Sequence, residues 1–257
     1  MAPVIDLNAD VGEGFGAWRM ADDDGLLDVV TSANVACGFH AGDPSIMRRV
    51  CSRAAERGVI VGAHVSFRDL MGFGRRPMQM APDDLADDIA YQLGGLAAVA
   101  RASGSAVRYV KAHGALYNQA ADDRGIAEVI AAAVASFEPG LAVLCLPGSA
   151  MDSAATAAGL RPVAEGYLDR SYDDRARLVP RSRKGAVITD SDAVVARAVA
   201  LATHAPVQSV DGNDVTVDVR SLCTHGDTPA ALDLARAARR ALEGAGVTLR
   251  SFVAAPD

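Results

Sequence analysis

The chain has 257 residues, half of them hydrophobic, and a formal net charge of -7 at pH 7. This charge argues against nucleic acids and anionic membranes as partners, because both attract basic surfaces. No apolar run approaches the roughly 18 residues that a membrane helix needs, and the N-terminus lacks the basic region and apolar stretch of a signal peptide. We therefore expect a cytoplasmic protein.

Short apolar segments alternate with helical patterns along the whole chain. Strands are predicted, in order, at Val4–Asp10, Ser32–Gly38, Val59–Val65, Val107–His113, Leu141–Leu146, Val163–Leu168 and within Val215–Thr224. Helices are predicted at Pro44–Arg57, Pro82–Ser103, Asp123–Phe137, Ser149–Ala158, Ser191–His204 and Thr228–Ala245. This alternation is typical of βαβ units in a parallel sheet. About seven units predict one α/β domain over residues 1–257, built as a distorted or incomplete β/α barrel.

An open doubly wound sheet is the alternative fold. It is less favoured because no glycine fingerprint for a dinucleotide or a phosphate follows any predicted strand. Two segments interrupt the alternation, residues 66–82 and 169–184, and both are rich in arginine. Long segments of this kind are often functional. Their arginines, among them Arg75 and Arg170, either bind an anion or form a solvated rim.

The turn after the second predicted strand shows how the chain can place a functional side chain. Gly38 and Gly42 allow the backbone to turn tightly around His40. Asp43 is a good N-cap, and Pro44 suits the first position of the following helix. The sequence therefore predicts a strand, a loop that carries a histidine, and a helix.

Polar side chains recur where the predicted strands end. In chain order they are Asn8, Asp10, Glu13, His40, His64, Lys111, His113, Glu165 and His225. The carboxyl ends of parallel barrel strands open onto one face, where active sites lie. Such side chains suit either acid–base catalysis or a metal site. A metal would be bound by His64 and His113 with Asp10 or Glu165, although these spacings match no compact metal motif.

These residues lie in motifs that resemble the signatures of the LamB/YcsF family. The motifs cover residues 6–16, 34–44, 62–69, 72–77, 110–118, 169–172, 178–181 and 223–227, so the resemblance extends over nearly the whole chain. It implies a distorted seven-stranded barrel, similar to the folds of glycoside hydrolases and deacetylases. It also implies a hydrolase component of a 5-oxoprolinase, which opens 5-oxo-L-proline to L-glutamate with ATP as co-substrate and with two partner subunits, B and C.

For this reaction, the cluster of polar residues at the strand ends leads us to expect that Asp10 and His113 transfer protons. His40 and His64 would orient the substrate or the developing oxyanion, and Lys111 would stabilise charge. The residues expected to bind substrate are Asn8, Glu13, Arg75, Glu165 and Arg170. Two alternatives are a metal-dependent carbohydrate deacetylase or hydrolase, and a non-catalytic subunit that holds the substrate. Metal occupancy and assembly of several copies of the chain are left open.

Overall fold

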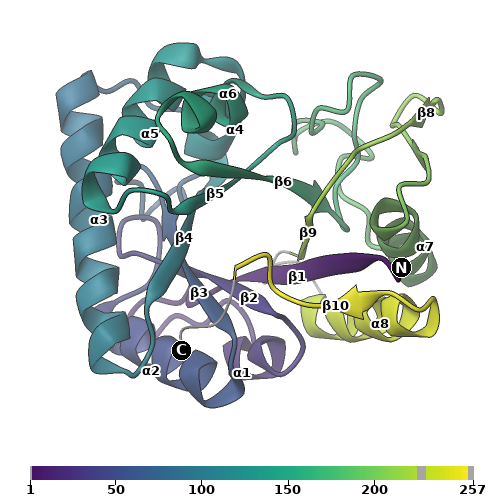
Figure 1. The fold of residues 1–257 in the computed structure, drawn as a ribbon, viewed down its shortest axis with the longest axis horizontal. Helices are drawn as coiled ribbons and strands as arrows, with labels where there is room; N and C mark the ends of the chain where they lie inside the picture. Colours follow the sequence, from purple (N-terminus) through teal and green to yellow (C-terminus); the bar gives the residue numbers. More distant parts are fainter. Residues whose placement is uncertain (1, 225–229, 254–257) are drawn as a thin grey trace.

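The computed structural model describes residues 2–224 and 230–253, and its central feature is a closed barrel of seven parallel strands (Figure 1). The strands are β1 (Val4–Val11), β2 (Ser32–Ala36), β3 (Ile60–Val65), β4 (Val107–Ala112), β5 (Ala142–Cys145), β6 (Arg161–Tyr167) and β9 (Ser221–Thr224). They pair in that order, and β9 pairs with β1 to close the ring. The predicted seven-stranded α/β barrel is confirmed.

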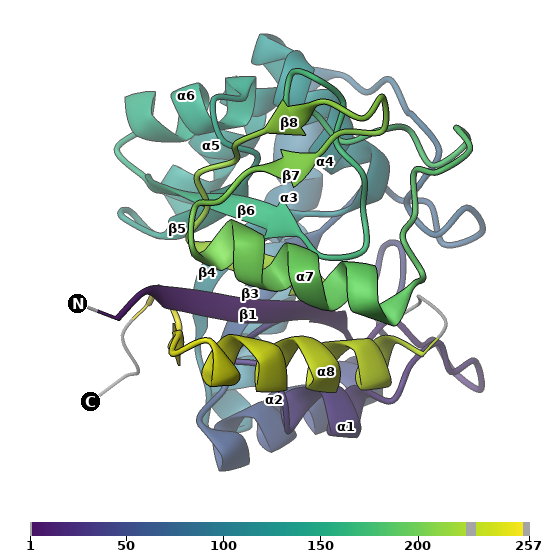
Figure 2. The ribbon, with the colours of Figure 1, turned by 90° about the vertical axis from the view of Figure 1, so that its right-hand side faces the viewer.

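Eight helices of the described residues lie outside the strands. The six predicted helices are present as α2 (Pro44–Arg57), α3 (Pro82–Ala102), α5 (Arg124–Phe137), α6 (Ala150–Ala157), α7 (Ser191–Ala202) and α8 (Ala231–Gly244). Helices α7 and α8 lie side by side against the β1 side of the barrel (Figure 2). Within the described residues, no helix is both long enough and apolar enough to cross a membrane.

Two helices were not predicted, α1 (Asp23–Leu27) and α4 (Gly114–Asp122). Helix α1 has only five residues, too few for an apolar period to show. Helix α4 begins with a glycine and is separated from α5 by the extended residue Asp123, whose carboxylate caps α5 by accepting the Ile126 N–H. The local sequence therefore predicted a helix start at Asp123 and gave no signal for the helix before it.

Three short strands complete the structure. β7 (Val207–Gln208) and β8 (Asp214–Val215) form an antiparallel hairpin, so only part of the predicted segment Val215–Thr224 belongs to the barrel. The hairpin contacts the long segment after β6, where the Val210 N–H donates to the Tyr172 carbonyl. β10 (Thr248–Leu249) runs parallel to the start of β1.

The barrel interior is polar, whereas the layer between strands and helices is apolar. Along β1, Leu7, Ala9 and Val11 belong to the apolar core beneath the helices, while the alternate residues Asp6, Asn8 and Asp10 take part in interior hydrogen bonds. This is the two-residue alternation of a barrel strand. Buried polar groups are costly unless they are paired, so the interior can exist only as a connected network.

Candidate functional site

A pocket of about 400 Å³ opens at the carboxyl ends of the strands. The pocket is formed by strand residues, by the first turn of α4 and by both arginine-rich segments. Its lining includes Asp10, His64, Arg75, Lys111, His113, Tyr117, Tyr167, Arg170 and Arg181. The structure therefore brings together six of the predicted site residues around one hollow. The other four, Asn8, Glu13, His40 and Glu165, are buried. Glu13, His40 and Glu165 contact residues of the lining, and Asn8 is hydrogen-bonded to Glu165 behind it.

The charged centre of the site is Lys111. Its Nζ atom lies 2.9 Å from Glu165 Oε1 and 3.1 Å from Asp10 Oδ1, and all three side chains are buried. Burial alone would lower the pKa of Lys111, but Asp10, Cys223 and Glu165 outweigh it and hold that pKa well above its usual value. Lys111 is therefore an ammonium group that holds two carboxylates beneath the pocket.

Amide side chains link this centre to the rest of the interior. Asn34 Nδ2 donates to Asp10 Oδ1 at 2.8 Å and to Asn8 Oδ1 at 2.7 Å. Asn8 Nδ2 in turn donates to Glu165 Oε1 at 3.1 Å, and the Tyr109 hydroxyl donates to Asn34 Oδ1 at 2.6 Å. Such a network fixes the direction of each carboxylate.

Beside the charged centre lies a buried group formed by Glu13, His40, His64 and His113, called the histidine group below. His113 Nδ1 lies 3.0 Å from His64 Nε2, and the His40 and His113 rings stack with centroids 3.9 Å apart. Burial, and then the neighbouring histidines, lower the pKa values of His40 and His113 well below the usual value. One ligand atom from each of the four residues lies within 4.8 Å of the others, so the group could hold a metal ion.

The histidine group differs from the metal set expected from sequence. It keeps His64 and His113 but replaces the carboxylate of Asp10 or Glu165 with Glu13 and adds His40. Asp10 Oδ2 does approach His64 Nε2, at 3.4 Å, while Oδ1 is engaged by Lys111.

Two turns bring the histidines together. At Gly42, where φ is +83°, an added Cβ would lie 2.6 Å from the Ala36 carbonyl oxygen, so only glycine fits this turn after β2. Asp43 then caps α2 as predicted, accepting the N–H groups of Ser45 and Ile46. At Gly74 an added Cβ would lie 2.7 Å from His113 Cδ2, so the loop backbone packs directly on the imidazole.

The arginines of the two long segments divide into structural and pocket-facing residues. Arg68 pairs with the buried Asp88, and Arg76 pairs with Asp69. Arg75 lies over the Phe73 ring and lines the pocket. Arg170 also lines it, but its guanidinium donates to the carbonyls of Val179 at 2.6 Å and Ala186 at 3.3 Å, so it also shapes its own segment.

Sequence reasoning missed several interior residues that hold the site in place, namely Asp6, Asn34, Tyr109, Tyr167, Ser221 and Cys223. The polar alternation of Asp6, Asn8 and Asp10 in a buried strand was the available signal, because it predicts a polar interior. Predicted site residue His225 lies outside the described residues.

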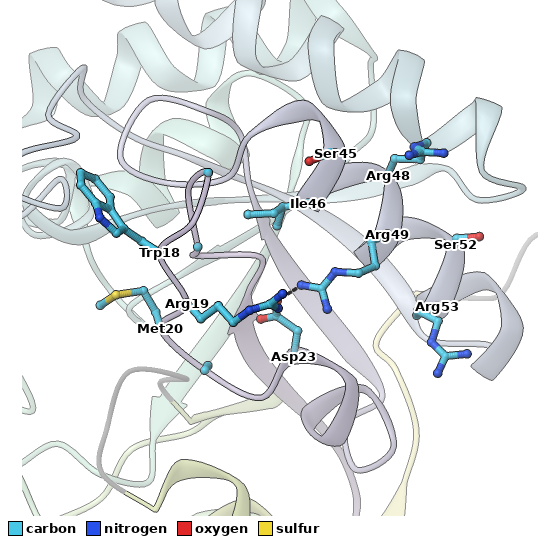
Figure 3. Close-up of a pocket in the computed structure, with 13 residues that line it drawn as sticks. Trp18, Arg19, Met20, Asp23, Ser45, Ile46, Arg48, Arg49, Ser52 and Arg53 are labelled. Carbon is cyan, nitrogen blue, oxygen red and sulfur yellow. Dashed lines mark hydrogen bonds and ion pairs between the residues drawn. The ribbon is translucent and has the colours of Figure 1, made fainter.

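A second hollow, of about 550 Å³, lies between the loop after β1 and helix α2 (Figure 3). Arg19, Arg48, Arg49 and Arg53 line it together with the exposed Trp18. Arg49 is paired with Asp23 at 2.9 Å. None of the predicted site residues that the structure describes lines this hollow.

Comparison with known proteins gives consistent matches over the chain. The model of the LamB/YcsF family matches residues 5–256. A protein of Nocardia farcinica that is named as the A subunit of 5-oxoprolinase is 55% identical over 249 residues, covering 97% of this chain and 99% of that protein. The protein of the same name from Streptomyces coelicolor is 57% identical, covering 97% and 100%.

Solved structures agree with these matches. The lactam utilization protein from Thermus thermophilus superposes with a TM-score of 0.92 at 44% identity, covering 97% of this chain and 100% of that one. A family 4 carbohydrate esterase from Streptomyces lividans reaches a TM-score of 0.50 at 13% identity, covering 99% and 98%, which is a likeness of fold alone.

Proposed function

The chain belongs to the LamB/YcsF family, and on this premise we propose that it is the A subunit of a 5-oxoprolinase, which opens 5-oxo-L-proline to L-glutamate. The observation that carries the proposal is the name shared by relatives 55–57% identical over almost their whole length. The same proposal includes ATP as co-substrate of the complex, partner subunits B and C, and a cytoplasmic location. The word "subunit" in the relatives' name supports an enzyme of several chains.

The pocket suits a small anionic lactam. Arg75, Arg170 and Arg181 line it together with Asp10, so cationic groups and a buried carboxylate share one pocket. Guanidinium groups bind carboxylates through paired, charge-assisted hydrogen bonds. We propose that Arg75 and Arg181 bind the carboxylate of 5-oxoproline, which turns its ring carbonyl towards Asp10.

A lactam is a stable amide, and phosphorylation of its oxygen by ATP converts that oxygen into a leaving group. Water must then attack the carbonyl carbon, and the ring nitrogen must gain a proton as its bond to carbon breaks. This leaves an acyl phosphate, which a second water hydrolyses to glutamate and phosphate. Asp10 is the proposed proton acceptor, because it lines the pocket and its Oδ1 atom lies 3.1 Å from the Lys111 ammonium group. The same ammonium group stabilises negative charge that develops on the substrate.

The structure alters the role that we propose for His113. Its Nε2 atom lies 2.8 Å from the Phe73 carbonyl oxygen, which can only accept, so the Nε2 proton is used there. In the neutral ring, no proton remains on Nδ1 for the substrate. We therefore propose that Asp10 performs both transfers, taking a proton from water and returning it to the ring nitrogen, while His64 and His40 belong to the wall beside it.

Glutamate release from 5-oxoproline and ATP tests the proposal, with this chain alone and with its B and C partners. Release is expected only from the mixture and is expected to be lost with Asp10→Asn, while Asp87→Asn, at an exposed site on α3, serves as the matched control. Undiminished release with Asp10→Asn would favour the non-catalytic subunit. No release from a mixture with competent partners would contradict the proposed function and would favour a hydrolase that acts on carbohydrates.

A further inference from the structure

Two nitrogen lone pairs face each other inside the histidine group. His64 Nδ1 lies 3.3 Å from the Lys111 carbonyl oxygen, and His113 Nε2 lies 2.8 Å from the Phe73 carbonyl oxygen. A carbonyl oxygen only accepts, so both of these nitrogens carry the ring protons. The remaining nitrogens, His64 Nε2 and His113 Nδ1, are then unprotonated in the neutral rings and lie 3.0 Å apart. Two lone pairs at this separation repel unless a cation lies between or beside them.

The ring nitrogens of His40 also lack the partners that a buried imidazole needs. It is completely buried, and neither of its ring nitrogens has a hydrogen-bond partner among the residues that the structure describes. Its Nε2 atom lies 3.5 Å from Glu13 Oε1, and that oxygen lies 3.6 Å from His113 Nδ1. A buried imidazole without hydrogen bonds is costly, and here it lies against a carboxylate and two other imidazoles.

The distances between these atoms match those around a tetrahedral ion, and the stacked rings of His40 and His113 would have to turn relative to each other for both to bind it. A metal with nitrogen and oxygen ligands at ~2.0–2.1 Å holds adjacent ligand atoms about 3.3–3.4 Å apart. The distances from His64 to His113 (3.0 Å), from His40 to Glu13 (3.5 Å) and from Glu13 to His113 (3.6 Å) lie around that value. All four ligand atoms lie within 4.8 Å of one another. The contacts from His64 and His113 to backbone carbonyls are the outer-shell hydrogen bonds that orient metal-binding histidines.

We propose that Glu13, His40, His64 and His113 bind one divalent transition-metal ion in the wall of the pocket. Three imidazoles and one carboxylate suit zinc and its neighbours, whereas magnesium and calcium prefer oxygen ligands alone. Glu13 is the proposed carboxylate ligand because its Oε1 atom lies near both His40 and His113. Asp10 lies beside the group, with Oδ2 3.4 Å from His64 Nε2, while Lys111 and Asn34 engage its Oδ1 atom.

The four ligands come from the ends of four consecutive strands. Glu13 follows β1, His40 follows β2, His64 belongs to β3 and His113 follows β4. A bound ion would therefore add a further link between four elements that strand pairing and interior side-chain hydrogen bonds already join. It would also supply a positive charge at the pocket wall, where His64 and His113 line the cavity.

The proposal is tested by metal content and does not depend on 5-oxoprolinase activity. The full-length protein is stripped with a chelator, reloaded with zinc, dialysed and analysed for bound metal. A single zinc ion per chain is expected, together with a melting temperature that rises on reloading. His40→Gln and Glu13→Gln are expected to weaken zinc binding more than ~10-fold. His204→Gln, at an exposed histidine outside the group, is the matched control.

Cobalt titration of the wild-type protein keeps the test independent of whether a variant folds. Tetrahedral cobalt bound by nitrogen and oxygen gives visible absorption bands, which should saturate at one equivalent and disappear when zinc is added. If the folded wild-type protein binds neither zinc nor cobalt, the proposal is wrong. The short distance between His64 and His113 would then be explained by a proton shared between the two rings. A chain that binds zinc but releases no glutamate with competent partners would overturn the proposed function and leave this inference standing.

Discussion

The ammonium group of Lys111 lies 3.1 Å from the carboxylate of Asp10 inside the barrel, and both side chains are almost inaccessible to water. The same ammonium group lies 2.9 Å from Glu165. One cation therefore pairs with two buried carboxylates, and the stability of the pocket floor depends on it.

Replacing Lys111 with methionine should destabilise the protein by about 3–5 kcal/mol, because it leaves Asp10 and Glu165 buried without their cation. The free energy of unfolding from urea titration measures the effect. Lys184→Met changes the only other lysine of the chain, at an exposed position, and should stay within ~0.5 kcal/mol of wild type. Similar stability for both variants would show that the two buried carboxylates do not need the cation.

Asp6 should make stability fall as pH rises. Burial raises its pKa from 3.8 to about 6, although hydrogen bonds from Ser221, Thr31 and Ser32 oppose the shift. The folded state thus binds this proton more tightly than the unfolded chain does. The Asp6 contribution is fully present below pH 3.8 and is lost as pH rises through about 6.

Asp6→Asn removes this contribution. Relative to wild type, the variant should gain up to ~3 kcal/mol between pH 4 and pH 7, since each pKa unit corresponds to about 1.4 kcal/mol. Urea unfolding across that range measures the difference. A constant difference at every pH would contradict the raised pKa of Asp6.

Gly62 in β3 should not tolerate a side chain. An added Cβ would lie 2.2 Å from the buried Tyr109 ring, whose hydroxyl is fixed by Asn34. Gly62→Ala should therefore destabilise the protein by at least ~1–3 kcal/mol. Gly94→Ala, in α3 with open space around its Cβ, should instead stabilise it by up to ~1 kcal/mol. Thermal and urea unfolding compare the two, and equal effects would argue against close packing at Gly62.

Arg75→Gln should raise the KM for 5-oxoproline about 10–100-fold in the assembled enzyme, because a hydrogen bond to a charged group is worth ~1.5–3 kcal/mol. A smaller change is expected in kcat, since the contact positions the substrate. Arg175→Gln alters an exposed arginine of the other long segment and should leave both constants unchanged. An unchanged KM for Arg75→Gln would remove this residue from the carboxylate site.

The sequence by itself determined the repeated strand–helix units and the end of the barrel where chemistry is possible. These follow from local properties, namely apolar periodicity, the Asp43 cap and the polar residues at strand ends. Local signals were insufficient for α1 and α4, where the helix is too short or begins at a glycine.

Only the tertiary structure decided which polar groups meet. Strand pairing sets His64 opposite Lys111 and Asp10 opposite Asn34, and a slip of one residue would turn each side chain to the other face. Closure of β9 onto β1 brings Cys223 to Lys111, residues 112 positions apart in the chain. Hence the approach of Glu13 to His40 and His113, with Asp10 beside His64, could not be read from spacing, because it depends on register and closure over the whole barrel.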